Sequence, residues 1–283
     1  HIRSVLLGDA PIMCGAPLSH LLRCFLSSGM WLSEVSSMDA PQTDSNLEIL
    51  YKDEYLLAVN KPAGIIVHAD GTNEPSLTDV VCEKLRALKS PTEADLSQVQ
   101  ALNRLDKETT GIVLFSLKKE TQPQFDQLIA SKELSKEYLA AVKGAFEPNK
   151  LLIDKAIGKD RHDAQKMRIS DTGKPSQTEA HLIKVASSAQ GQTQSLLLVN
   201  LLTGRRHQIR VHLSSLGFPL VGDALYGGVS SLQRGAKKKH KAQPLMLHAY
   251  RVGFIHPVMG AKIVIKTDIP ERFSYFGVLE KDL

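Results

Sequence analysis

The loop ALNRLDKETTG carries the first residues in this chain whose types and spacing could do chemistry. Asp106 lies between Arg104 and Lys107, and the loop closes at Gly111 before an apolar run. A carboxylate flanked by cations stays ionised at neutral pH, so Asp106 is a candidate nucleophile or base and not an acid. Taken alone, the loop favours a structural interpretation, in which Asp106 accepts backbone hydrogen bonds in a turn.

A second polar segment, LTGRRHQIRVHL, follows an apolar strand-like run. Arg206 and Arg210 are four residues apart and would share one face of a helix. Arginine forks suit phosphates or a partner carboxylate, although a solvated basic helix face is the alternative interpretation. His207 and His212 lack the further ligands of a metal site, so we expect no metal.

Charge is unevenly distributed. The net charge is +5, yet residues 205–251 contain nine Lys and Arg against Asp223 alone. A basic segment on a slightly acidic body suggests a polyanionic partner, while the lysines of residues 237–241 could equally form a solvated loop. Three cysteines without close spacing fit a reducing cytoplasm, and no apolar run reaches the roughly 18 residues of a membrane span.

The pattern of apolar residues predicts an α+β fold in which strands outnumber helices. Ser76 and Asp79 match a capping box at a helix start. The expected strands are residues 47–51, 55–60, 65–68, 111–117, 136–143, 177–186, 195–202, 245–255 and 261–266, and the expected helices are 77–88, 124–131, 207–216 and 270–281. No P-loop, Rossmann, zincin or serine-hydrolase signature is present.

Five blocks resemble the RluA-type family of RNA pseudouridine synthases, in the family's order. They are VNKPAGIIVHAD (59–70), NRLDKETTGIVLF (103–115), KEYLAAVKG (136–144), LLTGRRHQIRVHLSSLGFPLVGDALYGG (201–228) and LHAYRVGFIHP (247–257). The resemblance implies an enzyme that isomerises uridine to pseudouridine within RNA, without a metal or an organic cofactor. It covers most of residues 47–283, which we expect to form the catalytic domain.

The resemblance also implies roles for five residues. Asp106 would be the catalytic carboxylate, Tyr138 the aromatic side chain that stacks on the target base, and Arg210 the partner that keeps Asp106 charged. Arg104 would enter the space left by the flipped nucleotide, and Leu247 would form an apolar wall under the uracil. Attack on the base, attack at C1′ and proton abstraction at C2′ remain open chemical routes.

Arg205, Arg206 and Lys61, with the lysines of residues 237–241, are expected to contact phosphates and not to catalyse. The expected partner is a structured RNA, either rRNA or tRNA, whose target uridine must leave its stack. This chain has Asn103 where the family usually has His, and Thr110 where the family usually has Ser. Both side chains can still form hydrogen bonds.

Residues 1–46 are expected to be a poorly ordered extension ending in the polar linker DAPQTDSN, without the S4 RNA-binding domain that many family members carry. We expect a cytoplasmic monomer. Two alternatives stay open: a non-catalytic RNA-binding protein that uses the same basic groove, and a DNA strand-transfer enzyme built on the HxxR of His207 and Arg210 with Tyr226 or Tyr250 as nucleophile.

Overall fold

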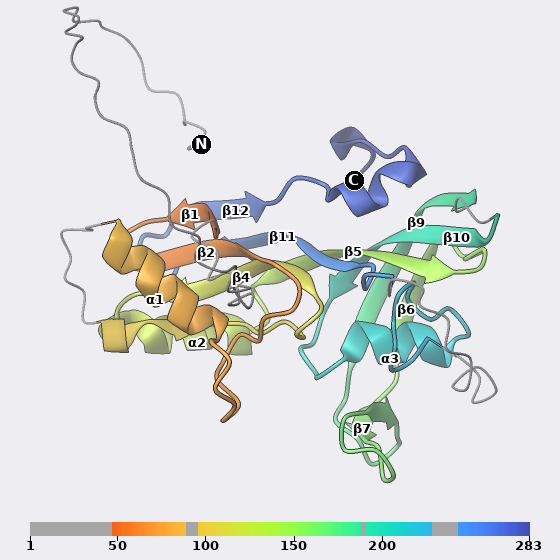
Figure 1. The fold of residues 1–283 in the computed structure, drawn as a ribbon, viewed down its shortest axis with the longest axis horizontal. Helices are drawn as coiled ribbons and strands as arrows, with labels where there is room; N and C mark the ends of the chain where they lie inside the picture. Colours follow the sequence, from red (N-terminus) through yellow and green to blue (C-terminus); the bar gives the residue numbers. More distant parts are fainter. Residues whose placement is uncertain (1–46, 89–95, 188–190, 228–242) are drawn as a thin grey trace, which may run out of the picture. The chain divides into compact units, whose positions relative to one another are not determined.

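A ten-stranded, mainly antiparallel sheet forms the centre of the computed structural model, which describes residues 47–88, 96–187, 191–227 and 243–283 (Figure 1). Its strand order is β1-β2-β4-β11-β5-β10-β9-β6, and β3 and β12 pair with β4 and β11. Few helices accompany the sheet, so the α+β prediction is confirmed. The sheet strands are β1 (Glu48–Lys52), β2 (Leu56–Lys61), β3 (Gln100–Ala101), β4 (Thr110–Ser116), β5 (Ser135–Lys143), β6 (Lys150–Asp154), β9 (Gln177–Ser187), β10 (Thr193–Leu201), β11 (Leu247–Ile255) and β12 (Lys262–Lys266). A separate hairpin joins β7 (Ile157–Lys159) and β8 (Met167–Ile169).

One parallel pair interrupts the antiparallel order, because β4 and β11 start side by side in the middle of the sheet. Gly111 makes this approach possible. Its φ is +111°, and a Cβ built there would lie 2.2 Å from the carbonyl oxygen of Ala249. The loop before β4 and the first residues of β11 are thereby brought to one place.

In the part of the chain that the structure describes, three α-helices lie beside the sheet: α1 (Leu77–Ala87), α2 (Gln122–Ala130) and α3 (Gln208–Ser215). The predicted capping box at α1 is present, since Ser76 and Asp79 bond each other's backbone N–H groups. Helix α3 begins differently. Its N-cap residue, His207, has left-handed backbone angles (φ 55°), and the side chain is directed elsewhere.

The two faces of the sheet carry separate cores, as strand alternation requires. On β4, Val113 and Phe115 pack on one face with α1, while Ile112 and Leu114 pack on the other with α2. A third cluster on the second face is closed by the C-terminal segment, which contributes Phe273 and Phe276.

Two predicted elements are wrong. Residues 65–68 are not a strand, because the carbonyls of Ile66 and Val67 accept hydrogen bonds from the first amides of α1, Leu77 and Thr78. Residues 270–281 are not one helix but the two 3-10 helices η4 (Glu271–Phe276) and η5 (Glu280–Asp282). Gly277 ends η4 in the left-handed conformation (φ 61°).

The described residues also include the 3-10 helices η1 (Leu96–Gln98) and η2 (Lys119–Thr121). None of the helices in the described ranges is long and apolar enough to cross a membrane. The predicted extension 1–46 and the lysines of residues 237–241 lie outside the described residues.

Candidate active site

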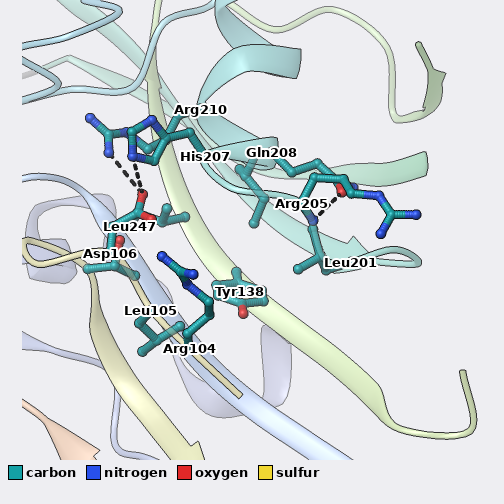
Figure 2. Close-up of a pocket in the computed structure, with 12 residues that line it drawn as sticks. Arg104, Leu105, Asp106, Tyr138, Leu201, Arg205, His207, Gln208, Arg210 and Leu247 are labelled. Atoms are coloured by element: carbon teal, nitrogen blue, oxygen red, sulfur yellow. Dashed lines mark hydrogen bonds and ion pairs between the residues drawn. The ribbon is translucent and has the colours of Figure 1, made fainter. Parts of the chain in front are cut away.

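One pocket gathers most of the side chains that the sequence singled out (Figure 2). The loop before β4 supplies Arg104 and Asp106, and β5 supplies Tyr138. Leu247 is the first residue of β11, beside β4 in the parallel pair. The segment from Arg205 to Arg210, at the start of α3, closes the pocket.

Arg210 holds two carboxylates at once. Its Nε and Nη2 donate to Oδ2 and Oδ1 of Asp223 at 2.8 and 2.9 Å, and its Nη1 donates to Oδ2 of Asp106 at 2.9 Å. The Asp223 side chain is 0% exposed, that of Arg210 8% and that of Asp106 21%. Asp223 therefore anchors the guanidinium from inside the protein, and Nη1, the nitrogen that does not contact Asp223, donates to Asp106 at the pocket.

Arg210 and Asp223 are both buried, so the charge of each depends on the other. Burial opposes the charge of Arg210, but the hydrogen bonds and attraction of Asp223, and then of Asp106, outweigh it and raise the pKa of the guanidinium. Burial would likewise raise the pKa of Asp223, and the hydrogen bonds from Arg210 reverse this and lower it. The backbone amides of Leu225 and Tyr226 also donate to Asp223. Arg210 is thus not on a solvated basic helix face.

The two oxygens of Asp106 have different surroundings. Oδ2 accepts from Arg210 and lies 3.7 Å from Nε2 of His207, whereas Oδ1 has no hydrogen-bond partner among the described residues. Lys107 does not assist Asp106, since it forms an ion pair with Glu74 at 2.8 Å. Within the described ranges, Asp106 therefore lines the pocket with one oxygen held by Arg210 and one that accepts no hydrogen bond.

His207 is oriented by Tyr226. The hydroxyl of Tyr226 accepts from the backbone N–H of Met167 and lies 2.8 Å from Nδ1 of His207. Burial, followed by the charges of Arg210 and Arg206, lowers the pKa of His207 despite the attraction of Asp106. If the Tyr226 hydroxyl donates to Nδ1, the proton of the neutral ring is on Nε2 and faces Asp106.

Tyr138 is a buried phenol at the opposite side of the pocket from Arg210 (Figure 2). Burial and the nearby charge of Asp106 raise its pKa, so it remains protonated at neutral pH. The Arg104 guanidinium lies between Asp106 and Tyr138 in Figure 2, and no hydrogen bond or ion pair to it is found in the described part of the chain. Arg104 thus lines the same pocket as Asp106 and Tyr138, and no described contact holds its guanidinium there.

Lys61 contradicts its predicted role. Its side chain is fully buried, and its Nζ donates to the carbonyl oxygens of Pro62 and Lys107. Burial lowers its pKa to about 8, against the attraction of Glu108 and Asp106. Lys61 thus links the loop after β2 to the loop that carries Asp106, and it is not available to a phosphate.

Arg205 and Arg206 are exposed, as phosphate contacts require, but Arg206 also donates to the carbonyls of Ala164 and Gln165 beside β8. The two departures from the family are structural. Asn103 bridges Ile112 and Leu114 of β4. Thr110 contacts His248 and accepts from Arg272, both at 2.6 Å, and Arg272 also donates to the carbonyl of Leu247.

Sequence reasoning missed Asp223, and it assigned Tyr226 and His207 to other chemistries. A signal for Asp223 existed, because it is the single acid among nine cations in residues 205–251. The hydroxyl of Tyr226 is engaged and Tyr250 is buried, so neither is a free nucleophile. No group of three or more metal-ligating side chains occurs in the described ranges.

Comparisons with known proteins place the chain in a family. The family model described as RNA pseudouridylate synthase matches residues 55–215. The uncharacterized RNA pseudouridine synthase YhcT of Bacillus subtilis is 36% identical over 224 residues, which are 79% of this chain and 69% of that protein. The ribosomal large subunit pseudouridine synthase D of Xylella fastidiosa is 32% identical over 250 residues, which are 86% of this chain and 72% of that one.

Two solved human structures share the fold. RNA pseudouridylate synthase domain containing 1 has a TM-score of 0.64 at 26% identity, covering 84% of this chain and 89% of its own. Domain containing 4 has a TM-score of 0.63 at 25% identity, covering 81% and 90%.

The fold and the matched residues define an isomerase that acts on RNA. The chain belongs to the RNA pseudouridylate synthase family, as its five RluA-type blocks predicted. It converts uridine in RNA to pseudouridine. The DNA strand-transfer alternative is wrong, because it requires a long helical domain where the described residues form a sheet. The non-catalytic binder is likewise set aside by the family assignment.

Proposed function

We propose that Asp106 is the catalytic carboxylate and that it acts through Oδ1 on a uridine flipped out of a structured rRNA or tRNA. The observation that carries this proposal is the Arg210 bridge. Arg210 is anchored by buried Asp223 and holds only Oδ2 of Asp106, so Asp106 is oriented at the pocket and its second oxygen has no described hydrogen-bond partner.

The reaction itself is balanced without a co-reactant. The bond from C1′ to N1 breaks, a bond from C1′ to C5 forms, and the proton of C5 is lost while N1 gains one. Each of the three chemical routes requires an ionised carboxylate within contact of the nucleoside. Arg210 places its positive charge against Asp106, and the buried Leu247 gives the pocket an apolar surface for the base.

Tyr138 is proposed to stack on the uracil while it rotates. Because its pKa is raised, Tyr138 is not available as a phenolate base near neutral pH. Any part that Tyr138 takes in proton transfer must therefore begin from its neutral hydroxyl. Arg104 would leave the pocket as the uridine enters and would fill the vacated position in the RNA. The absence of a described partner on Arg104 supports that movement.

Binding is proposed to use the exposed Arg205 and Arg206 on RNA phosphates, together with the basic segment of residues 205–251. These contacts offset the few kcal/mol needed to unstack the target nucleotide. We further propose a monomer in the cytoplasm, which light scattering on the purified protein and microscopy of the tagged protein can test.

The experiment is Asp106→Asn, with modified uridines mapped in total rRNA and tRNA from cells that contain each variant. Asn keeps the shape and a hydrogen-bond acceptor but removes the charge, so pseudouridine at the target position should disappear. Asp268→Asn, at an exposed site past β12, is the matched control and should leave modification unchanged. Persistent pseudouridine in Asp106→Asn would show that the nucleophile has been misassigned.

A further inference from the structure

A second cavity of about 700 Å³ adjoins the catalytic pocket and shares Leu201 and Arg205 with it. It lies where the end of α2, the start of β5 and the end of β10 come together. Leu201 and Leu202 give it an apolar surface, and Leu202 is 42% exposed. The cavity therefore combines room, an apolar surface and a direct continuation from the place where the uridine reacts.

Lys136 is the distinctive charge of this cavity. It is half-buried, and in the described ranges no hydrogen bond or ion pair engages its ammonium group. Burial lowers its pKa. The neighbouring acid Glu137 is committed to Arg251, and Glu133 is exposed. A desolvated ammonium without a partner is costly to keep, which points to an anion that arrives from outside.

The position of Lys136 on β5 links it to the catalytic pocket. Lys136 and Tyr138 are two residues apart on one strand, so their side chains point to the same face, about 7 Å apart along the strand. Tyr138 lines the catalytic pocket and Lys136 lines the cavity. The two sites are successive positions along one strand, which suits two successive nucleotides of one RNA chain.

We propose that this cavity binds the nucleotide adjacent to the target uridine, with Lys136 on its phosphate and Leu201 and Leu202 against its base. The proposal rests on the proposed function, since it assumes that the uridine itself lies between Asp106 and Tyr138. Arg205, which lines both sites, would contact the backbone that joins the two nucleotides. A free anion would use the ammonium but would leave the apolar surface empty.

The test combines the variant Lys136→Met with chemical changes in the RNA. Binding is measured with a target oligoribonucleotide, and with versions in which one phosphate at a time, on either side of the uridine, is replaced by a neutral methylphosphonate. Loss of one charged contact should weaken the binding of unmodified RNA about 10-fold to 100-fold. Lys136→Arg should retain most of the affinity, and Lys262→Met, on exposed β12, should retain all of it.

At one phosphate position, the methylphosphonate should weaken RNA binding by the wild-type protein as much as Lys136→Met weakens binding of unmodified RNA. The same methylphosphonate should have little further effect on RNA binding by Lys136→Met. Additive losses at every position would overturn the proposal. Thermal unfolding distinguishes a role of Lys136 in RNA binding from a role in stability. Because Lys136→Met removes an unpaired, half-buried charge, the melting temperature of this variant should be unchanged or raised. A lowered melting temperature with unchanged affinity would also overturn it. Pseudouridine formation by the wild-type protein and its loss in Asp106→Asn report separately on the proposed function.

Discussion

At the scale of single residues, Asp106, the proposed catalytic carboxylate, is held by Arg210, a residue far from it in the sequence. Asp106 and Arg210 were recognisable as candidates from their polar segments. The partner that anchors Arg210 was not, because Asp223 is buried and reaches it only through the fold. Lys61 shows the opposite error, since a lysine next to a turn resembles a surface cation until its burial is seen.

Asp223→Asn should damage both stability and activity. The substitution leaves the buried Arg210 with Asp106 as its one carboxylate partner among the described residues, and breaking a buried pair from one side costs about 3–5 kcal/mol. Urea unfolding and single-turnover isomerisation measure the two effects. The double variant with Arg210→Met should recover stability but not activity. Recovery of both would contradict the proposed role of Arg210.

Lys61 predicts a pH dependence of stability. Its pKa is about 8 in the folded protein against 10.5 normally, so the unfolded chain binds more protons between these values. The free energy of unfolding of wild type relative to Lys61→Met should therefore rise as pH increases from 8 to 10.5, by up to about 3 kcal/mol. Urea titrations at pH 7.5, 9 and 10.5 would show it. A difference that does not change with pH would mean that burial does not lower the pKa of Lys61 in the folded protein.

At the scale of elements, the parallel start of β4 and β11 positions the site. It brings the loop that carries Asp106 next to Leu247, and β5 places Tyr138 beside Ala249 on β11. Strand periods and the capping box were readable from local patterns. The conformation of residues 65–68 was not, because hydrogen bonds to the start of α1 replaced a strand partner.

Gly111→Ala tests this junction. Its Cβ would meet the Ala249 carbonyl at 2.2 Å in a backbone conformation that L residues rarely adopt, so we expect a loss of at least about 1–3 kcal/mol of stability and reduced isomerisation. Gly71→Ala is the matched control, with φ +88° but no atom within 4 Å of the added Cβ. Equal effects in the two variants, by thermal unfolding, would show that backbone strain and not the close approach of β11 is decisive.

At the scale of the whole molecule, charge is segregated, with nine cations and one acid in residues 205–251 of a chain whose net charge is +5. Such a distribution attracts a polyanion over distances that salt can screen. Arg210 forms a buried ion pair with Asp223 and is not available to RNA. Fewer of the basic residues in 205–251 can therefore contact RNA than the sequence contains.

RNA affinity should accordingly fall steeply with salt. Each phosphate contact adds about 0.7 to the slope of log affinity against log salt for single strands and about 0.9 for a duplex. Titration from 50 to 300 mM KCl should give a slope of several units, and Lys136→Met should reduce it by about one contact. A slope near zero would contradict an electrostatic mode of binding.

The amino-acid sequence alone determined the family, the α+β class and the identity of the polar loops. Strand alternation, helix caps and the five family blocks are all patterns of residues close together in the sequence, so they can be recognised without the fold. The tertiary structure alone decided which charges are paired, buried or free. Asp106 and Arg210 are 104 residues apart in the chain, and Arg210 and Asp223 are on separate segments. The burial that makes Lys61 structural, and leaves Lys136 without a described partner, arises from contacts between distant segments that no local pattern records.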